Sequence, residues 1–129
     1  MYCKPIALLK IVDREGKVLY EAKPEPKRVI DAEAAYLTTN MLQDVLISGT
    51  AGGMGIGRPA AGKTGTTDTY IDAWFVGYTP DLSTAVWVGD DNNKSMNRMY
   101  GSGAPLSICM ISWSTLWPLL RAPASAIRA

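Results

Sequence analysis

The chain has no histidine among its 129 residues, and this absence removes several kinds of active site. Ser–His triads, Cys–His dyads and most zinc or non-haem iron sites require an imidazole. Acid–base chemistry would therefore have to use lysine, carboxylates, tyrosine or water. The chain has only two cysteines, Cys3 and Cys109, and they lie too far apart in sequence to suggest a metal cluster or a disulfide framework. We expect neither a metal nor a cofactor.

An excess of charge of one sign is also missing. Thirteen Lys and Arg residues face twelve Asp and Glu residues, so the net charge is +1, and the basic residues are scattered. A nucleic-acid-binding domain of this size is usually more basic or clusters its cations, so we expect no nucleic-acid partner. The one long apolar stretch, Leu106–Leu120, is too short for a bilayer crossing and contains Pro118. It predicts a helix that is buried or lies on a surface.

The composition supports one folded domain, because apolar residues make up 47% of the chain. Ile6–Val12 and Val18–Tyr20 flank the turn Asp13–Gly16 and predict a β-hairpin. Residues 21–30 contain two prolines among charges and predict a connector. A helix is expected to follow.

That helix has clear start and stop signals. Asp31 is suited to an N-cap, and Gly49 follows the last helical position at Ser48. Apolar residues at spacing four along it predict one buried face; they are Leu37, Met41 and Val45, flanked by Leu42 and Leu46.

The second half begins with a glycine-rich loop over residues 49–57 and continues with three predicted strands: Ala61–Thr66, Ala73–Thr79 and Thr84–Gly89. Short connections between strands require antiparallel neighbours. The central and last strands carry aromatic residues that we expect in the core: Trp74, Tyr78 and Trp87.

Residues 90–103 predict a loop rich in Asn, Ser and Gly. Pro105 fits the start of a last helix that runs to Trp117 and ends at Pro118, and residues 122–129 predict a tail. The fold class is α+β, an antiparallel sheet with flanking helices. Such a thin sheet needs cover at its edges, which indicates that part of the domain is missing.

Residues Gly57–Thr64 match the pattern GxxxxGK[ST] of a phosphate-binding loop, which raises a nucleotide hydrolase as one alternative. That motif needs a buried strand before it and a helix after it. Here a glycine-rich loop precedes the motif, and residues with strand spacing follow it. Short connections also disfavour the parallel sheet of a nucleotide-binding fold.

The same residues have a second interpretation as a strand motif, Lys63-Thr64-Gly65. Alternation along a strand places Lys63 and Gly65 on one face, and Thr64 and Thr66 on the other. An edge strand can pair with an extended peptide, Lys63 supplies a cation, and the two threonines supply hydroxyls for a carboxylate. The amide of Thr66 could face a developing oxyanion. KTG is one of three motifs of penicillin-recognising serine enzymes, beside SxxK and SxN.

The wider context of the motif adds weight to this interpretation. In one collinear order over roughly residues 5 to 117, the informative segments are Asp13–Gly16, Ala35–Leu42, Gly49–Ala51, Ala61–Asp68, Asp72–Pro80, Ala85–Gly89 and Gly103–Pro105. Together they closely resemble the transpeptidase domain of class A penicillin-binding proteins.

The resemblance implies a fold, an activity and partners. The fold is an antiparallel sheet with helices on both faces, and the activity is D,D-transpeptidation of peptidoglycan through an acyl-enzyme on serine. The implied partners are stem peptides ending in D-Ala-D-Ala and the β-lactams that mimic them. The implied location is the extracytoplasmic face of the bacterial inner membrane, with any anchor outside this chain.

The resemblance also implies roles for individual residues. Lys63 is the cation near the substrate carboxylate and the SxN serine, Thr64 and Thr66 bind that carboxylate, and the Thr66 amide belongs to the oxyanion hole. Gly65 leaves room for close approach of a neighbour. Thr67 and Asp68 line the strand end.

The family's nucleophile is absent, because no lysine of this chain is preceded by a serine at the spacing SxxK. Ser95-Met-Asn97 spells SxN, but it follows KTG where the family has it before, so we interpret it as loop. Residues 1–129 therefore correspond to the C-terminal part of one transpeptidase domain. We expect it to be inactive alone and to pair with the missing N-terminal part or with itself.

Three further questions stay open at this stage. The chain could be a non-catalytic module that binds cell-wall peptides and keeps only the strand groove. Arg58, in the glycine-rich loop, could approach substrate, although a solvated arginine is the simpler interpretation. The apolar last helix fits packing between the sheet and a neighbouring domain better than contact with a membrane surface.

Overall fold

The structure is a computed structural model that describes residues 2–121. The chain divides into two compact units, residues 1–37 and residues 38–129, each treated by itself below. Helix α1, Ala32–Ile47, crosses the boundary between them. It begins directly after Asp31, as the N-cap signal predicted, and the predicted tail over residues 122–129 lies outside the described residues.

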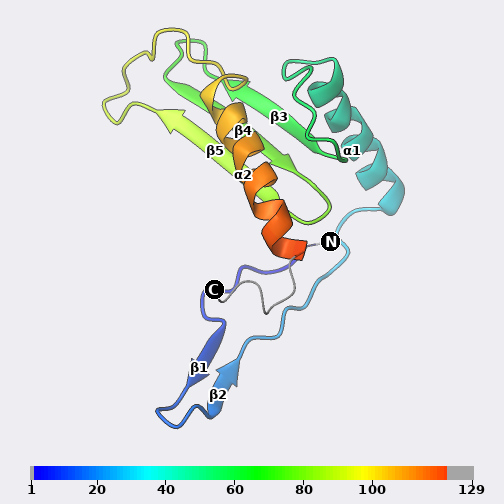
Figure 1. Ribbon diagram of the computed structural model, residues 1–129, viewed down its shortest axis with the longest axis vertical. Helices are drawn as coiled ribbons and strands as arrows, with labels where there is room; N and C mark the ends of the chain where they lie inside the picture. Colours follow the sequence, from blue (N-terminus) through cyan, green and yellow to red (C-terminus); the bar gives the residue numbers. More distant parts are fainter. Residues whose placement is uncertain (1, 122–129) are drawn as a thin grey trace. The chain divides into compact units, whose positions relative to one another are not determined.

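The first unit contains a β-hairpin formed by β1, Lys10–Val12, and β2, Val18–Glu21 (Figure 1). One carboxylate oxygen of Asp13 accepts hydrogen bonds from the amides of Glu15 and Lys17 at 3.1 and 2.7 Å, which fixes the turn. The strand predicted from residue 6 is shorter than expected. Pairing ends near Leu9 because Pro24 and Pro26 on the opposite segment lack the N–H that a ladder needs.

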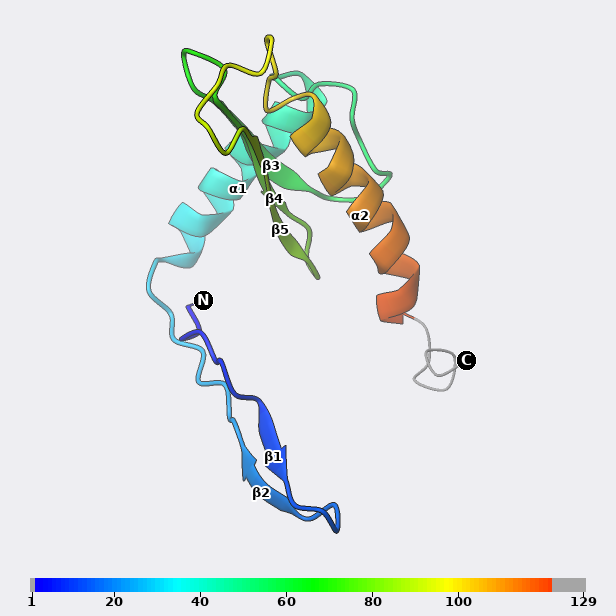
Figure 2. The same ribbon diagram turned by 90° about the vertical axis from the view of Figure 1, so that its left-hand side faces the viewer.

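The second unit is built on a sheet with the order β3-β4-β5, in which both neighbouring pairs are antiparallel. The strands are β3, Ala61–Thr66, β4, Asp72–Tyr78, and β5, Ser83–Gly89, which confirms the three strands predicted from the sequence. Figure 2 shows the sheet nearly edge-on, with α1 and α2 on opposite sides of it. In the described sheet, β3 is an edge strand.

Helix α2, Ala104–Arg121, covers one face of the sheet by packing on β4 and β5 (Figure 1). Its Trp113 meets Phe75 edge-on, with ring centroids 6.3 Å apart, and donates its indole N–H to the Thr84 hydroxyl at 2.9 Å. Gly77 allows this approach, because a Cβ there would lie 2.8 Å from the Trp113 ring. The core cluster consists of Leu46, Ala51, Phe75, Leu106, Cys109, Met110 and Trp113.

Proline 118 does not end the last helix, contrary to the sequence prediction, and α2 continues to Arg121. A proline inside a helix removes one hydrogen bond and costs about 3 kcal/mol. The guanidinium groups of Arg58 and Arg121 lie over the Trp117 ring, 3.2 and 4.3 Å from its centre, and these contacts favour the helical last turn. Sequence rules for helix ends do not include such contacts.

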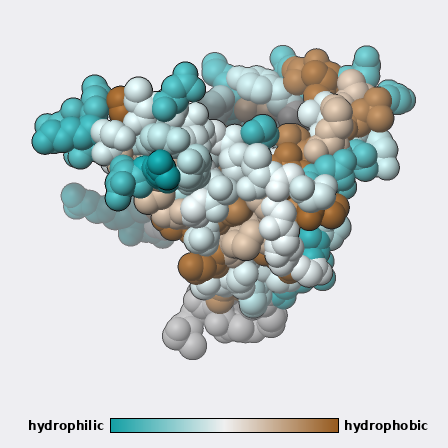
Figure 3. All heavy atoms as spheres, turned by 90° about the horizontal axis from the view of Figure 1, so that it is seen from above, coloured by the Kyte–Doolittle hydropathy of each residue, from teal (hydrophilic) through white to brown (hydrophobic). Residues whose placement is uncertain are grey.

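The sheet face opposite α2 is largely uncovered in the described residues, and two core predictions are wrong there. Trp74 and Trp87 are 43% and 46% exposed, and Val76 is 46% exposed. Tyr78, also expected in the core, is only partly buried. The two indole rings face each other across β4 and β5, with centroids 6.2 Å apart. In Figure 3, brown apolar groups reach the surface at several places between polar ones.

The predicted buried face of α1 is also only partly buried. Leu46 is buried and Val45 packs against the core, whereas Leu37 and Met41 are 60% and 63% exposed. Only the C-terminal turns of the helix reach the core cluster, so its N-terminal apolar residues have no surface to pack against among residues 2–121. None of the helices in this range is long and apolar enough to cross a membrane.

We expect the two cysteines to differ sharply in reactivity, because Cys3 is exposed and Cys109 lies in the core. Burial raises the pKa of the Cys109 thiol from 9.0 to about 11, against a smaller opposing effect of the Thr84 hydroxyl. Iodoacetamide at pH 8 should alkylate Cys3 in the folded protein and Cys109 only after unfolding, as read by mass spectrometry. A Cys3→Ser variant is the control.

The same shift gives a pH dependence. The unfolded chain ionises Cys109 first, so the contribution of this thiol to stability should fall as pH rises from about 9 towards 11. A Cys109→Ala variant should lose that part of the pH dependence in urea unfolding. Rapid alkylation of Cys109 in the folded chain would contradict the buried position.

Candidate functional site

The motif Lys63-Thr64-Gly65 lies in the middle of the edge strand β3, and the strand divides its side chains between two faces. Lys63 pairs with Val76 and Gly65 with Trp74, which places both on the sheet face opposite α2, called the open face below. Thr64 pairs with Phe75 and Thr66 with Ala73, which places both hydroxyls on the side of α2. The alternation predicted from the sequence is confirmed.

Lys63 is exposed, and its ammonium group donates a hydrogen bond to the carbonyl of Thr64 at 2.8 Å. It forms no ion pair with a carboxylate among the described residues. Gly65 has no side chain, so the surface of β3 beside Lys63 is open. A Cβ at this position would meet only the Cβ of Trp74, at 3.3 Å. The cation is therefore available to an anionic ligand that lies along β3.

Thr64 is held from the glycine-rich loop. Its hydroxyl lies 2.9 Å from the hydroxyl of Thr50, and either group can be the donor. Thr50 follows the end of α1 in a turn closed by the buried Ala51. The site prediction from the sequence missed Thr50, although Gly49-Thr50-Ala51 was among the segments that carried the family resemblance.

The side chain of Thr66 is held by the loop before α2. Its hydroxyl oxygen accepts a hydrogen bond from the amide of Gly101 at 3.0 Å. Gly101 is buried and stands three residues before α2. This contact joins positions 35 residues apart, and nothing in the sequence pointed to it except a glycine in a predicted loop.

Thr67 lies just outside β3, where it organises the turn to β4. Its hydroxyl oxygen accepts hydrogen bonds from the amides of Ile71 and Asp72 at 3.1 and 2.9 Å, and its own amide donates to the carbonyl of Asp72 at 3.0 Å. Asp68 is in the same turn. Thr67 therefore stabilises the turn between β3 and β4, next to Thr66.

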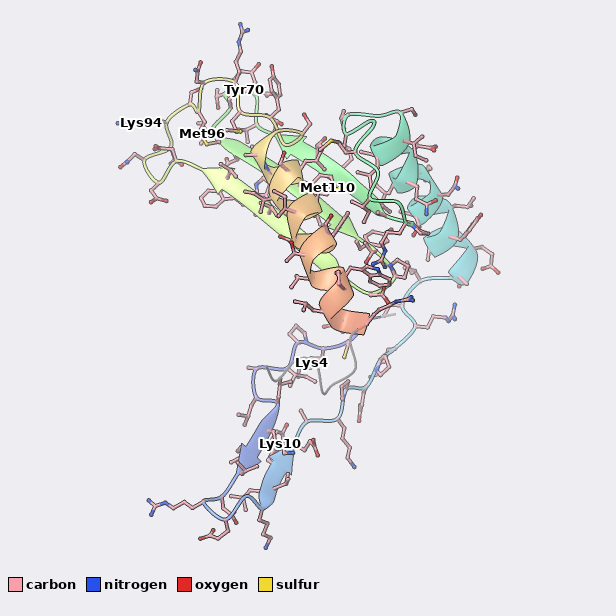
Figure 4. All side chains as sticks on the ribbon, in the orientation of Figure 1. Lys4, Lys10, Tyr70, Lys94, Met96 and Met110 are labelled. Atoms are coloured by element: carbon pink, nitrogen blue, oxygen red, sulfur yellow. The ribbon has the colours of Figure 1, made fainter. Side chains whose placement is uncertain are left out.

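The turn after β3 and the loop before α2 are tied together above the end of the strand. The rings of Tyr70 and Tyr100 meet edge-on with centroids 5.2 Å apart, and their hydroxyls are 3.3 Å apart. The hydrogen bond and the charge of Tyr100 raise the pKa of Tyr70. The amide of Met96 donates to the carbonyl of Tyr70 at 2.9 Å, and Figure 4 shows these two residues side by side.

The nucleotide-binding interpretation of Gly57–Thr64 is wrong. Lys63 and Thr64 belong to β3, and the segment after them is strand, turn and the antiparallel strand β4. No helix N-terminus faces these residues in the described part of the chain. Ser95 and Asn97 lie in the loop before α2, as predicted, and Asn97 has a positive φ of 48°.

Arg58 is not the solvated side chain that the sequence suggested, because its side chain is only 14% exposed. Its guanidinium pairs with the carboxylate of Asp81 in the β4–β5 turn and lies 3.2 Å from the centre of the Trp117 ring. One nitrogen, Nη1, is buried without a hydrogen-bond partner among the described residues. Arg58 therefore links the segment before β3 to the β4–β5 turn and to α2, and it does not contact Lys63, Thr64 or Gly65.

A small cavity of about 150 Å³ lies at the start of β3, between α1 and the end of β4. The hydroxyls of Thr39 and Tyr78 are 2.8 Å apart at its edge. None of the KTG residues lines it, so it is separate from the candidate site.

An antiparallel sheet with an accessible KTG edge strand and a C-terminal helix on one face has the features of the penicillin-recognising class. The family model described as "Penicillin binding protein transpeptidase domain" matches residues 2–108. The chain therefore belongs to the penicillin-binding protein transpeptidase domain family.

Individual relatives agree with this assignment. Penicillin-binding protein 1A of Aquifex aeolicus (strain VF5) is 45% identical over 108 residues, which cover 82% of this chain and 15% of that protein. Penicillin-binding protein 1B of Escherichia coli (strain K12) is 41% identical over 105 residues, or 79% of this chain and 12% of that protein. The crystal structure of penicillin-binding protein 1A from Haemophilus influenzae superposes with a TM-score of 0.82 at 26% identity.

That superposition covers 94% of this chain and 24% of the solved chain. The chain thus spans a minor part of the length of the proteins that it matches. It corresponds to a segment of a transpeptidase domain, and the predicted fold class is confirmed. Metal-binding groups of three or more Cys, Asp or Glu side chains are absent from the described residues.

We expect the Arg58–Asp81 pair to contribute measurably to folding. Removing Asp81 leaves a largely buried guanidinium without its carboxylate, so Asp81→Ala should lower the free energy of unfolding by about 1–3 kcal/mol. Urea unfolding followed by tryptophan fluorescence measures this change. Asp91→Ala, in the exposed loop, is the matched control, and equal stability of the two variants would contradict the assignment.

Proposed function

We propose that this chain forms the KTG wall of a peptidoglycan D,D-transpeptidase and so contributes to the site that β-lactams occupy. The observation that supports it most is the accessible edge strand β3. Its lysine has no carboxylate partner among the described residues, and its two threonine hydroxyls each bond to a residue of a neighbouring loop. The membership of the chain in the transpeptidase domain family adds the reaction class.

Each residue of the wall has a chemical task in this proposal. A stem peptide ending in D-Ala-D-Ala lies extended along β3, and the hydroxyls of Thr64 and Thr66 bind its terminal carboxylate. The ammonium of Lys63 supplies positive charge beside that carboxylate. The Thr66 amide donates to the oxygen that becomes negative when the scissile carbonyl is attacked.

The nucleophile in this proposal is a serine outside this chain. That serine, in an SxxK motif, attacks the penultimate D-Ala carbonyl, its proton passes to the motif's lysine, and the terminal D-Ala leaves with a proton. The acyl-enzyme then reacts with the amine of a second stem peptide. This chain binds and orients the substrate, and it acts in the bacterial cell envelope together with the nucleophile-bearing portion.

We infer that the nucleophile-bearing portion borders the free edge of β3 and also covers the open face of the sheet. Lys63 and Gly65 share this face with the exposed side chains of Trp74, Val76 and Trp87. A protein surface seldom leaves so many large apolar groups together unless a partner covers them. The relatives, which are several times longer, supply enough chain to do so.

A non-catalytic module that binds wall peptides is the second candidate, and the absence of SxxK from this chain favours it. In both candidates β3 binds the peptide, and only the transpeptidase adds a nucleophilic serine. Sequencing the intact gene product upstream of residue 1 separates them, because an SxxK motif there supports the transpeptidase and its absence supports the binding module.

Acylation provides the functional test. The chain alone should give no covalent band with a fluorescent penicillin on a denaturing gel, because it has no SxxK serine. The native polypeptide that includes the SxxK portion should give one, and Lys63→Ala should weaken it by roughly a hundredfold or more, as loss of a charged transition-state contact does. Labelling of the isolated chain, or unchanged labelling of the Lys63→Ala variant, would contradict the proposal.

Association provides a test of the open face. The isolated chain should self-associate or bind the nucleophile-bearing portion, and Trp74→Ser should weaken this association at least roughly tenfold. Ile111→Ser is the matched control, because Ile111 is 66% exposed on α2, away from the open face. Light scattering and sedimentation measure both. A chain that stays monomeric and does not bind the added nucleophile-bearing portion would contradict the proposed role of the open face in association.

A further inference from the structure

The loop before α2 touches the backbone of the KTG strand directly at Gly101. A Cβ built at this position would lie 2.2 Å from the carbonyl oxygen of Trp74, and 2.6 and 2.9 Å from the carbonyl oxygen and amide nitrogen of Gly65. Contacts this short with backbone atoms cannot be relieved by rotating a side chain. Only glycine fits at position 101, and it brings the loop against β3 without a side chain between them.

This close approach determines how the hydroxyl of Thr66 is used. The amide of Gly101 is a donor only, so at 3.0 Å it occupies a lone pair of the Thr66 oxygen. The hydroxyl proton is then left to donate elsewhere, and no acceptor for it is found among the described residues. The Thr66 side chain is exposed, so this proton can be given to a ligand.

The neighbouring hydroxyl of Thr64 has no such fixed donor direction. It is paired with another hydroxyl, that of Thr50, and the pair can share its proton in either direction. Of Thr64 and Thr66, only Thr66 accepts a hydrogen bond from a backbone amide among the described residues. The two hydroxyls therefore differ in the chemistry that they offer to the same ligand.

We propose that Gly101 is a positioning residue that makes the Thr66 hydroxyl a hydrogen-bond donor toward the terminal carboxylate of the bound peptide. The inference rests on the proposed function and deepens it by assigning which hydroxyl donates and what directs it. A carboxylate offers acceptors only, so it matches this donor, whereas a terminal carboxamide also presents N–H groups. Gly101 thereby favours a free peptide C-terminus over an amidated one.

The loop is held firmly enough to serve this role. Gly103 donates its amide to the carbonyl of Tyr100 at 2.9 Å, and the Tyr70–Tyr100 ring pair ties the loop to the turn that follows β3. Gly101 thus lies between two anchored points, Tyr100 and the start of α2 at Ala104. The amide that faces Thr66 is fixed from both sides.

The hydrogen bond itself is tested in the ¹⁵N-labelled chain of 129 residues. In Thr66→Val, which keeps the shape and removes the acceptor, hydrogen exchange of the Gly101 amide should speed up by roughly tenfold. Thr66→Ser should restore protection, and Thr69→Val, in the adjacent turn, should leave it unchanged. Protection of Gly101 that survives Thr66→Val would overturn the inference.

The ligand is tested by titrating the same chain with N-acetyl-D-Ala-D-Ala and with its C-terminal amide. The acid should shift the amide resonances of Thr66 and Gly101 and bind roughly fivefold to tenfold more tightly than the carboxamide. Thr66→Val and Gly101→Ala should erase this preference, and Thr66→Ser should keep it. Gly55→Ala, where a Cβ meets nothing within 4 Å, is the matched glycine control.

Two failures are distinguishable. If the wild-type chain binds the acid but shows no change at Thr66 or Gly101, or keeps its preference in Thr66→Val, the positioning inference falls and the wall function stands. If no residue of β3 responds to either peptide, the proposed wall function falls for this chain, and the inference falls with it. Should Gly101→Ala not fold, the Thr66 pair of variants still decides the question.

Discussion

The packing of α2 against the sheet is the interaction on which the rest of the second unit depends. Trp113 lies against Phe75 and Gly77, and Trp113, Leu106 and Cys109 are among the largest fully buried side chains of the described residues. This contact selects which face of β4 is buried and therefore which face of β3 carries Thr64 and Thr66. It also brings the loop before α2 to the end of β3. Burial of one helix thus determines the polarity of the candidate site.

Among the described residues, α2 covers one face of the three-stranded sheet, and the other face is largely open. On the covered side, hydroxyls and backbone amides are engaged with Thr50 and Gly101, so the groups that would bind a ligand are already ordered. On the other side, Lys63 stands beside exposed indole rings. The threonines of the candidate site are thus ordered by neighbouring loops while its lysine is exposed, which is consistent with the proposal that the chain forms one wall of a larger site.

The errors of the sequence predictions have a common origin. Trp74, Trp87, Leu37 and Met41 were expected to be buried because their spacing is that of a core face, yet all four are exposed in the described part of the chain. Pro118 was expected to end α2, but the helix continues to Arg121, where the guanidinium groups of Arg58 and Arg121 lie over the Trp117 ring. In both cases a local pattern predicts the element, and contacts outside that pattern decide its burial or its end.

The sequence alone determined the order of the elements, the antiparallel sheet, the family and the KTG residues, because strand alternation, short turns and collinear motifs are local properties of the chain. Tertiary structure alone decided that Arg58 is an internal tie, that Thr50 and Gly101 hold the threonines of the site, and that the two hydroxyls differ in polarity. These features join residues 14 to 35 positions apart. Their hydrogen bonds exist only once α1, α2 and β3 have been brought together.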